Sequence, residues 1–304
     1  MRALLIHNPQ AGAGDHKERE LMAALKLGRL TPEYCSTKSE DFRAALARTT
    51  DCYVAAGGDG TIAKVVENLP DRSRPVALMP LGTANNVARA FGIAGSPQEL
   101  AERYRPTMLG RLDIGMARGP WGEHRFIEAV GVGAVALAMG HKSSPESAPG
   151  SEKIMRGRDE LARTLRGLEA VELEIDIDGA PYNGSYLAVE IMNTPSSGPA
   201  LPLAPNADPG DGWLDVVLVR EGDRAAFLDW LSAPQHSPPA FGQVVRGRVI
   251  TLAWSAPDPL RIDDGLPELG TEPGRARIEI EPVPVLIMGL STSQNDERGD
   301  NDPK

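Results

Sequence analysis

The chain has 304 residues, a hydrophobic fraction of 41% and a formal net charge of −10. This length fits about two domains of roughly 150 residues each. The acidic balance excludes broad nonspecific binding of nucleic acid, which needs basic surface to neutralise phosphates.

The cysteines and the hydropathy of the sequence indicate in which cellular compartment the protein is located. The two cysteines, Cys35 and Cys52, lie in or beside apolar segments, which favours buried thiols over a disulfide. The apolar core of Met1–His7 is too short for a signal peptide, and the longest apolar stretch, Ala129–Met139, is shorter than the roughly 18 residues of a membrane span. We therefore expect a cytoplasmic protein, and any contact with lipid would be at its surface.

Short apolar runs alternate with helical patterns along the first hundred or so residues. We predict strands at Ala3–Ile6, Glu33–Ser36, Cys52–Ala56 and Val76–Met79, and helices at Lys17–Leu27, at Ser39–Arg48 with Ser39 as N-cap, and at Ile62–Leu69. This alternation predicts a parallel sheet with helices on both faces. Ligands of such sheets bind beyond the carboxyl ends of the strands.

Three turn segments follow predicted strands at that edge, namely Asn8–Gly12, Gly57–Thr61 and Pro80–Asn86. Glycine at a strand-to-helix turn lets the backbone approach a ligand, and the free amides of a helix start favour phosphate. Asp59 in the second turn can hold a magnesium ion. The plainer interpretation of this turn is the end of a buried strand.

After about Leu109 the pattern changes to strands separated by glycine and proline. We predict strands at Val171–Asp178, Tyr186–Met192, Leu214–Val219, Val249–Trp254, Leu260–Ile262 and Ala276–Ile280, with a hairpin turn at Asp178-Gly179. Several strands with few helices predict an antiparallel sandwich-like second domain. Residues 291–304 are polar and predicted to be disordered.

Lys153–Leu168 repeats apolar residues near one helical face and carries several arginines. A basic amphipathic helix can lie on an anionic membrane surface. A solvated helix that covers the second domain is the plainer interpretation.

The motifs also occur in a specific order along the chain: Asn8-Pro9 with Gly12, Gly57–Thr61, Pro80–Asn85 with Ala88-Arg89, Asp113–Gly115, Phe126 with Gly131 and Ala134, Leu203–Asp208, Asp211–Asp215, and Asp264-Gly265. In this order the chain resembles the diacylglycerol kinase catalytic-domain family, in particular the soluble bacterial lipid kinases. That family is related to sphingosine kinases and, more distantly, to NAD kinases.

The resemblance implies an α/β nucleotide-binding domain at residues 1–112 plus about 282–290, and a β-sandwich lipid-substrate domain at 113–281. It implies transfer of the γ-phosphoryl group of ATP, with Mg²⁺, to a lipid hydroxyl such as that of diacylglycerol. The implied partner is the lipid, reached at the membrane surface, and the sequence leaves a homodimer open.

The resemblance also implies roles for individual residues. The expected nucleotide-binding residues are Asn8, Gly57, Gly58, Gly60, Thr61, Gly82, Thr83 and Asn85. The expected catalytic residues are Asp59, which would engage Mg²⁺ through water, and Asp264. Asp211, Trp213 and Asp215 resemble a loop that binds a structural Mg²⁺ or Ca²⁺. The plainer interpretations are a helix cap for Thr61, an Asn-Pro turn for Asn8 and a polar turn for the loop.

Three positions depart from the family pattern. Ala63 and Lys64 replace an Asn-Glu pair, Asn86 replaces an aspartate, and Leu266 replaces the glutamate that is the family's proposed general base. Lys64 could pair with Glu67 or Asn68 one turn later, or contact a phosphate.

The loss of the family glutamate leaves the proton acceptor open among Asp263, Asp264 and Glu268. It also leaves open a noncatalytic or weakly active member that binds nucleotide or lipid. An NAD kinase-like enzyme is less favoured, because NAD kinases lack the Pro80–Asn85 loop.

Overall fold

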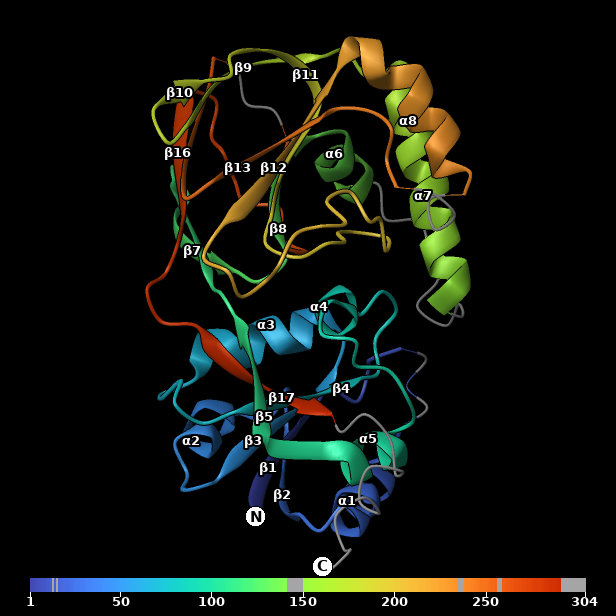
Figure 1. The fold of residues 1–304 in the computed structure, drawn as a ribbon, viewed down its shortest axis with the longest axis vertical. Helices are drawn as coiled ribbons and strands as arrows, with labels where there is room; N and C mark the ends of the chain where they lie inside the picture. The colour runs from blue at the N-terminus through green and yellow to red at the C-terminus, as the bar shows by residue number, and fades with distance from the viewer. Residues whose placement is uncertain (13, 15, 141–149, 234–237, 256–258, 291–304) are drawn as a thin grey trace, which may run out of the picture.

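The computed structural model describes residues 1–304 except 13, 15, 141–149, 234–237, 256–258 and 291–304. The predicted disordered tail lies outside the described residues. Two domains are stacked along the long axis of the molecule, and the chain starts in the lower one (Figure 1). The predicted fold class, an α/β domain followed by an antiparallel sandwich domain, is confirmed.

The first domain is built on a six-stranded sheet of order β2-β1-β3-β4-β17-β5. Its elements are β1 (Arg2–His7), α1 (Glu18–Leu27), β2 (Thr31–Ser36), α2 (Phe42–Leu46), β3 (Cys52–Gly57), α3 (Asp59–Asn68), β4 (Val76–Pro80), α4 (Asn86–Ala90), α5 (Pro97–Arg103), β5 (Tyr104–Leu112) and β17 (Val285–Leu290). The first four strands and β17 are parallel, whereas β5 runs antiparallel to β17.

Helices cover both faces of this sheet, as predicted. The connection from β1 through α1 leads to β2, on one side of β1. The connections from β2 through α2 to β3, and from β3 through α3 to β4, run in the opposite direction across the sheet. Because such crossovers are right-handed, α1 lies on one face of the sheet and α2 and α3 lie on the other. α1 packs on α5, so closely that a Cβ atom on Gly28 would lie 2.3 Å from the carbonyl oxygen of Ala101. The buried strands consist of nearly continuous apolar runs, as expected of a sheet that is covered on both faces.

The second helix differs from its prediction. α2 begins at Phe42 and ends at Leu46, so it is much shorter than the predicted helix at 39–48. Ser39 is not its N-cap; the Ser39 hydroxyl instead accepts a hydrogen bond from the N–H of Asp41, the residue that caps the helix. A local turn therefore takes the place of the first predicted helical turn.

The second domain contains an eleven-stranded, antiparallel arrangement. Its elements are β6 (Gly115–Gly119), β7 (Gly122–Phe126), β8 (Ala129–Gly133), α6 (Ala134–Gly140), α7 (Gly150–Gly167), β9 (Val171–Ile177), β10 (Ala180–Pro181), β11 (Gly184–Met192), β12 (Leu214–Arg220), the 3₁₀ turn η1 (Glu221–Asp223), α8 (Arg224–Leu231), β13 (Gln243–Gly247), β14 (Val249–Trp254), β15 (Leu260–Ile262) and β16 (Gly274–Ile280). The predicted hairpin turn is present, with left-handed φ angles of 50° at Asp178 and 88° at Gly179.

The layers of the sandwich separate at β11. Its first residues pair with β9, its later residues pair with β8, and a register shift lies between Tyr186 and Ala188. One apolar core fills the space between the layers, and another lies under the helices α6, α7 and α8. The second domain is therefore more helical than the strand pattern alone predicts.

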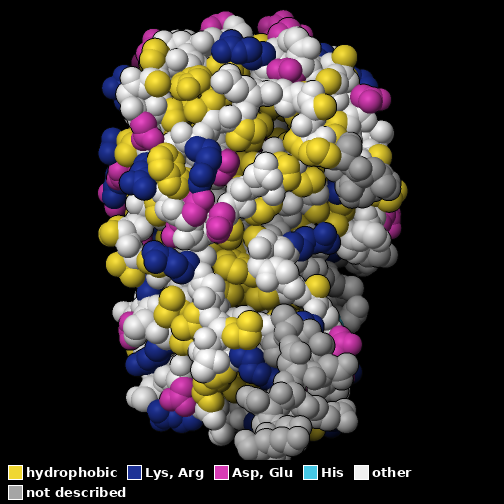
Figure 2. All heavy atoms as spheres, viewed as in Figure 1, with side chains coloured by type: hydrophobic (Ala, Val, Ile, Leu, Met, Phe, Trp, Pro, Cys, Tyr) yellow, Lys and Arg dark blue, Asp and Glu magenta, His cyan; other side chains and the backbone are white. Residues whose placement is uncertain are grey.

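Two chain crossings and several side-chain contacts join the domains. The chain passes upward after β5 and returns between β16 and β17 (Figure 1). Arg72 of the first domain binds Glu281 beside the returning segment at 2.6 Å. Figure 2 shows hydrophobic side chains gathered where the two domains meet, and acidic and basic side chains interspersed over the same face.

Candidate active site

The three predicted turns meet at one edge of the first sheet. Gly58 and Gly82 are in backbone contact, since a Cβ atom on Gly82 would lie 2.3 Å from the Cα atom of Gly58. Gly12 has a left-handed φ of 63°, and a Cβ atom there would lie 2.5 Å from the carbonyl oxygen of Leu81. The N–H of Leu81 donates to the carbonyl oxygen of Gly57 at 2.9 Å. Glycine is needed at these positions because the loops approach one another through their backbones.

These loops form one wall of a cleft of about 710 Å³ between the domains. The predicted nucleotide-binding residues that line it are Asn8, Gly58, Gly60, Thr61, Gly82 and Thr83, and Asp59 lines it as well. Gly57 and Asn85 are not among the described lining residues. Gly57 is buried behind Thr61, and a Cβ atom on it would lie 2.2 Å from the Thr61 hydroxyl oxygen.

Asn85 shapes the third loop. Its backbone is left-handed, with φ of 52° and ψ of 44°, a conformation that asparagine tolerates better than most residues. Its side chain accepts from the N–H of Gly82 at 3.0 Å and donates to the Gly82 carbonyl oxygen at 2.9 Å. Asn85 therefore holds the loop that presents Gly82 and Thr83 to the cleft.

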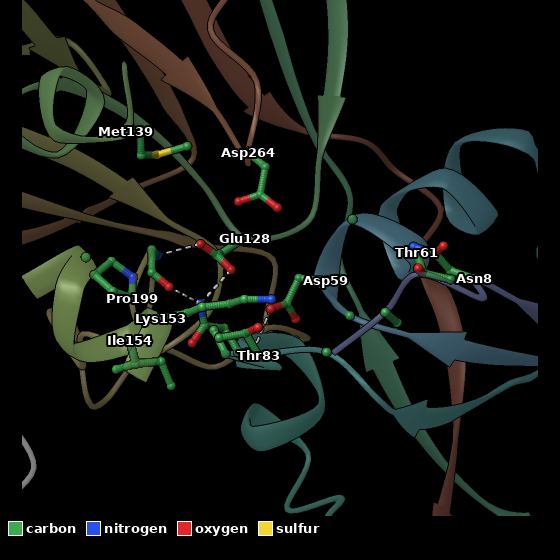
Figure 3. Close-up of a pocket in the computed structure, with 18 of the residues that line it drawn as sticks. Asn8, Asp59, Thr61, Thr83, Glu128, Met139, Lys153, Ile154, Pro199 and Asp264 are labelled. Atoms are coloured by element: carbon green, nitrogen blue, oxygen red, sulfur yellow. Dashed lines mark hydrogen bonds between the residues drawn. The ribbon is translucent and has the colours of Figure 1, made fainter. Parts of the chain in front are cut away.

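The structure contradicts a helix-cap role for Thr61 and agrees with a local turn at Asn8. Thr61 is not a helix cap, because α3 begins at Asp59 and Gly58 is its N-cap residue. Asn8 does form a local turn, since its side-chain oxygen accepts from the N–H of Gln10 at 3.1 Å. Asn8 and Thr61 lie together at one end of the cleft (Figure 3).

Asp59 is fixed by the start of α4. Its two carboxylate oxygens accept hydrogen bonds from the N–H groups of Asn86 and Val87, at 2.9 and 3.0 Å. Burial raises the pKa of Asp59, and the nearby charge of Asp264 raises it further. A cation at this carboxylate would remove part of that cost, because an opposite charge favours the ionised form.

Glu128, just before β8, is a site residue that the sequence reasoning missed. Its carboxylate accepts from the Nδ2 atom of Asn86 at 2.8 Å, the Ser197 hydroxyl at 3.0 Å and the N–H of Gly198 at 2.9 Å. Burial, followed by the charge of Asp59, raises the pKa of Glu128 to about 8. A single acid inside the apolar run Phe126–Val130 was the available signal, since glutamate is seldom fully buried.

The turn after β15 separates the alternative proton acceptors. The Asp263 carboxylate has a structural role, because it accepts hydrogen bonds from three successive backbone N–H groups, those of Ile127, Glu128 and Ala129. Asp264 lines the cleft and faces the start of α3, where a Cβ atom on Gly60 would lie 3.7 Å from its Oδ2 atom. Glu268 is not among the described lining residues. Of these three acids, Asp264 alone is among the described lining residues of the cleft.

The opposite wall of the cleft comes from the second domain and carries an apolar patch beside the charged residues Glu128, Lys153, Arg156, Glu160 and Asp264. Its lining side chains include Val135, Ala138 and Met139 of α6, Ile154 and Leu161 of α7, and Pro199. Figure 3 shows Met139, Ile154 and Pro199 on this side, with Asp264, Glu128 and Asp59 between the two walls. The cleft thus combines a polar wall of loops with a wall suited to a hydrocarbon.

The helix α7 packs along the second domain through the buried residues Leu161 and Leu165, in agreement with the covering interpretation. Its first turns also line the cleft, which neither interpretation anticipated. Lys153 reaches across to the first domain, where its Nζ atom lies 3.3 Å from the carbonyl oxygen of Gly12 (Figure 3). α7 therefore brings a cation to the glycine loops.

Lys64 also lines the cleft, but its predicted pairing with the next helical turn is wrong. Its Nζ atom donates to the Thr37 carbonyl oxygen at 2.5 Å and lies 4.8 Å from the centre of the Phe42 ring. The Asn68 side chain bonds the backbone carbonyl of Lys64 rather than its ammonium group. Ala63, the neighbouring departure, packs on the core of the first domain.

The predicted second metal loop has an arginine as partner. Asp211 forms an ion pair with Arg246, and the Arg246 Nε atom lies 3.9 Å from Asp215. The Trp213 ring lies beneath Arg246 and Arg248. Among the described residues, no group of three acidic, histidine or cysteine side chains is placed to hold a metal ion. A structural metal at Asp211, Trp213 and Asp215 thus stays a prediction, and it would have to displace Arg246.

The main cleft does offer oxygen atoms for a magnesium ion. The Oδ1 atom of Asn86 is buried and has no hydrogen-bond partner among the described residues. The backbone N–H of Asn86 donates a hydrogen bond to the Asp59 carboxylate. One carboxylate and one amide oxygen fit magnesium, which takes few protein ligands and completes its shell with water and substrate phosphate.

The fold and this cleft define a two-domain protein in which glycine loops of an α/β domain face the apolar wall of a β-sandwich domain. Residues 2–117 match the family model of the diacylglycerol kinase catalytic domain, and residues 148–288 match that of the YegS C-terminal NAD kinase beta sandwich-like domain. The chain belongs to the diacylglycerol kinase family of lipid kinases.

Individual relatives agree with this assignment. The chain is 30% identical over 246 residues to the diacylglycerol kinase of Bacillus subtilis (strain 168), across 75% of this chain and 76% of that protein. It is 32% identical over 245 residues to a probable lipid kinase YegS-like of Xanthomonas oryzae pv. oryzae (strain MAFF 311018), across 74% and 75%. A solved structure from Bacillus anthracis str. Sterne shares the fold over 95% of both chains, with a TM-score of 0.74 at 21% identity.

No helix in the described part of the chain is long and apolar enough to span a membrane. Cys35 and Cys52 are both buried free thiols, as predicted.

Proposed function

We propose that the protein is an ATP- and Mg²⁺-dependent kinase that transfers the γ-phosphoryl group of ATP to a hydroxyl of a lipid such as diacylglycerol. One observation carries the proposal: three glycine-containing loops meet on one wall of a cleft whose other wall carries an apolar patch. Family membership supports the reaction class, since the relatives are named diacylglycerol kinase and lipid kinase. We also propose a cytoplasmic location, where ATP is available and free thiols persist.

The loops supply the phosphate site. α3 begins at Asp59, which lines the cleft, and an anion is favoured at such a helix start. Gly58 and Gly82 let the backbone approach the phosphates, and Lys153 adds a positive charge from the second domain. Phosphoryl transfer depends mainly on this kind of positioning and charge stabilisation.

A magnesium ion would be held by Asp59, directly or through water, and by the amide oxygen of Asn86. When bound, it neutralises charge that develops on the transferring phosphoryl group. The orientation of the Asp59 carboxylate is already fixed, because each of its two oxygens accepts a hydrogen bond from a backbone N–H group.

The transfer itself needs a proton acceptor. The lipid hydroxyl oxygen forms a bond to the γ-phosphorus, the bond from that phosphorus to the bridging oxygen of ADP breaks, and the hydroxyl proton passes to the carboxylate of Asp264. Asp264 is exposed in the cleft and faces the start of α3. A loose transition state asks little of a base, which suits an aspartate in place of the family glutamate.

The apolar wall of α6 and α7 would hold the hydrocarbon of the acceptor. A cleft of about 710 Å³ accommodates a nucleotide tail and the reacting end of a lipid, and it falls within the usual size range of ligand sites.

The purified protein should transfer label from γ-labelled ATP to diacylglycerol in mixed micelles when magnesium is present. Asp59→Asn should lose more than about 99% of this activity, since the magnesium site loses its charge. Nucleotide binding without label transfer to any lipid of a total extract would instead support the noncatalytic alternative. Label on NAD rather than lipid would support the NAD kinase-like alternative.

A further inference from the structure

Asn86 and Glu128 come from different domains and share a hydrogen bond in the cleft. Asn86 is the first residue of α4, and Glu128 lies just before β8. The Nδ2 atom of Asn86 donates to Glu128 at 2.8 Å and to the Gly198 carbonyl oxygen at 3.1 Å. Both partners are acceptors, so they fix which end of the amide is the donor.

The orientation of Asn86 follows from these two bonds. With Nδ2 directed at the second domain, the Oδ1 atom must point the other way, where it is buried and has no partner among the described residues. The backbone N–H of the same residue binds Asp59. Asn86 therefore leaves an oxygen, not an NH₂ group, without a protein partner among the described residues, while its backbone N–H binds Asp59.

Several hydrogen bonds and a nearby buried arginine hold Glu128 in place. Its carboxylate also accepts from Ser197 and Gly198, and its own N–H donates to Asp263. Arg261 is fully buried, pairs with Glu190 at 2.5 Å and lies 3.8 Å from Glu128. Burying an acid is costly unless such partners surround it, so a carboxylate here is maintained against a stability cost.

We propose that Glu128 is a positioning residue that orients Asn86 and supplies, from the second domain, the carboxyl group that residue 86 itself lacks. Asn86 would contribute an oxygen to the magnesium ion, and the bound cation would favour the ionised form of Glu128 beside it. This inference rests on the proposed kinase function, because the ligand it serves is the magnesium ion of the nucleotide. It also makes the metal site dependent on contact between the two domains.

The test is a reciprocal exchange. Four proteins are compared with the unaltered chain: Glu128→Gln, Asn86→Asp, the double variant carrying both, and Glu174→Gln. Glu174 is an exposed glutamate on β9, so its variant makes the same chemical change away from the cleft. The first readout is calorimetric binding of a nonhydrolysable ATP analogue with and without Mg²⁺, and the second is label transfer to diacylglycerol.

Glu128→Gln should weaken the Mg²⁺-dependent part of analogue binding by about 10–100-fold, with little change in binding without metal. Asn86→Asp should also weaken it, because two carboxylates 2.8 Å apart repel. The double variant should bind within about tenfold of the unaltered chain, since the acid now lies at residue 86. Glu174→Gln should match the unaltered chain.

Two results would overturn the inference: metal-dependent binding that Glu128→Gln leaves unchanged, or a double variant no better than the worse single one. Circular dichroism and a melting curve for each protein separate these results from misfolding. If Glu128→Gln does not fold, Glu128→Asp replaces it and should show an intermediate loss. Absence of nucleotide binding in the unaltered chain would instead contradict the proposed function, which distinguishes the two failures.

Discussion

Gly58 and Gly82 touch through their backbones, so that the loops after β3 and β4 form one continuous surface. An added methyl group on Gly82 would lie 2.3 Å from the Gly58 Cα atom, a distance that backbone atoms cannot accept without moving. Gly82→Ala should therefore separate the loops, weaken nucleotide binding by about tenfold or more and cost about 1–3 kcal/mol of stability.

Calorimetric titration with ATP and thermal melting test this prediction. Gly167→Ala is the matched control, because no atom lies within 4 Å of a Cβ atom added there at the end of α7. Equal behaviour of the two variants would show that contact between the loops does not matter for the nucleotide.

Glu128 should make stability depend on pH. Its folded-state pKa of about 8 lies above the ordinary value of 4.5, so the folded protein keeps the proton longer than the unfolded chain does. The contribution of Glu128 to stability therefore falls as the pH rises from 4.5 to about 8. Glu128→Gln cannot ionise, and it should raise the melting temperature by about 5 °C near pH 8.5 but by about 2 °C or less near pH 5.5.

The melting temperatures of both proteins across this range provide the measurement. A difference between the proteins that is constant with pH would contradict burial of an ionisable group at this position. A variant that is more stable yet less active would show that the acid is kept for function.

Asp264 and Leu266 lie on the same turn but differ in their access to the cleft. Asp264 lines it, whereas Leu266 is 45% exposed and is not among the described lining residues. Asp264→Asn should lower kcat by about tenfold or more with little effect on the KM for ATP, because a loose transition state makes a modest demand on the base. Leu266→Glu should change kcat by less than about threefold, because a carboxylate there would lie outside the reach that proton transfer requires.

Steady-state kinetics with diacylglycerol and ATP varied separately test both variants. A tenfold gain from Leu266→Glu would instead mean that residue 266 reaches the acceptor hydroxyl once it carries a carboxylate.

Met139 belongs to the apolar wall of α6, and a charge there would face the hydrocarbon of the acceptor. Met139→Asp should raise the KM for diacylglycerol by about tenfold or more, since burying an unpaired carboxylate against lipid is costly. The KM for ATP should stay within about twofold. Met155→Asp is the matched control, because Met155 is 61% exposed. Equal KM values for lipid in both variants would place the acceptor elsewhere.

The sequence predicted the α/β sheet and its three loops because those signals are local. The apolar runs of β1, β3 and β4 are followed directly by glycine turns, and the parallel order brings the turns together. Strand β5 was missed because it contains Pro106 and Gly110, which argue against a strand. Proline is tolerated there because β5 is the edge strand of the sheet.

The charge arrangement of the cleft was less predictable, because it depends on contacts far apart in the chain. Asn86 and Glu128 are separated by 42 residues and belong to different domains, and Arg246 of β13 reaches Asp211 in the turn before β12. Position 86 could be recognised as lacking an acid, but the acid beside it appears only once the domains are in contact.

The position of β17 has a consequence for how the chain folds during synthesis. This strand, Val285–Leu290, lies between β4 and β5, and both strands lack a neighbour on that side until it arrives. The sandwich domain ends with β16 at Ile280, so it can assemble first on the ribosome. The nucleotide-binding sheet, though its first strands are translated earlier, closes only once Val285–Leu290 has emerged, after the strands of the sandwich.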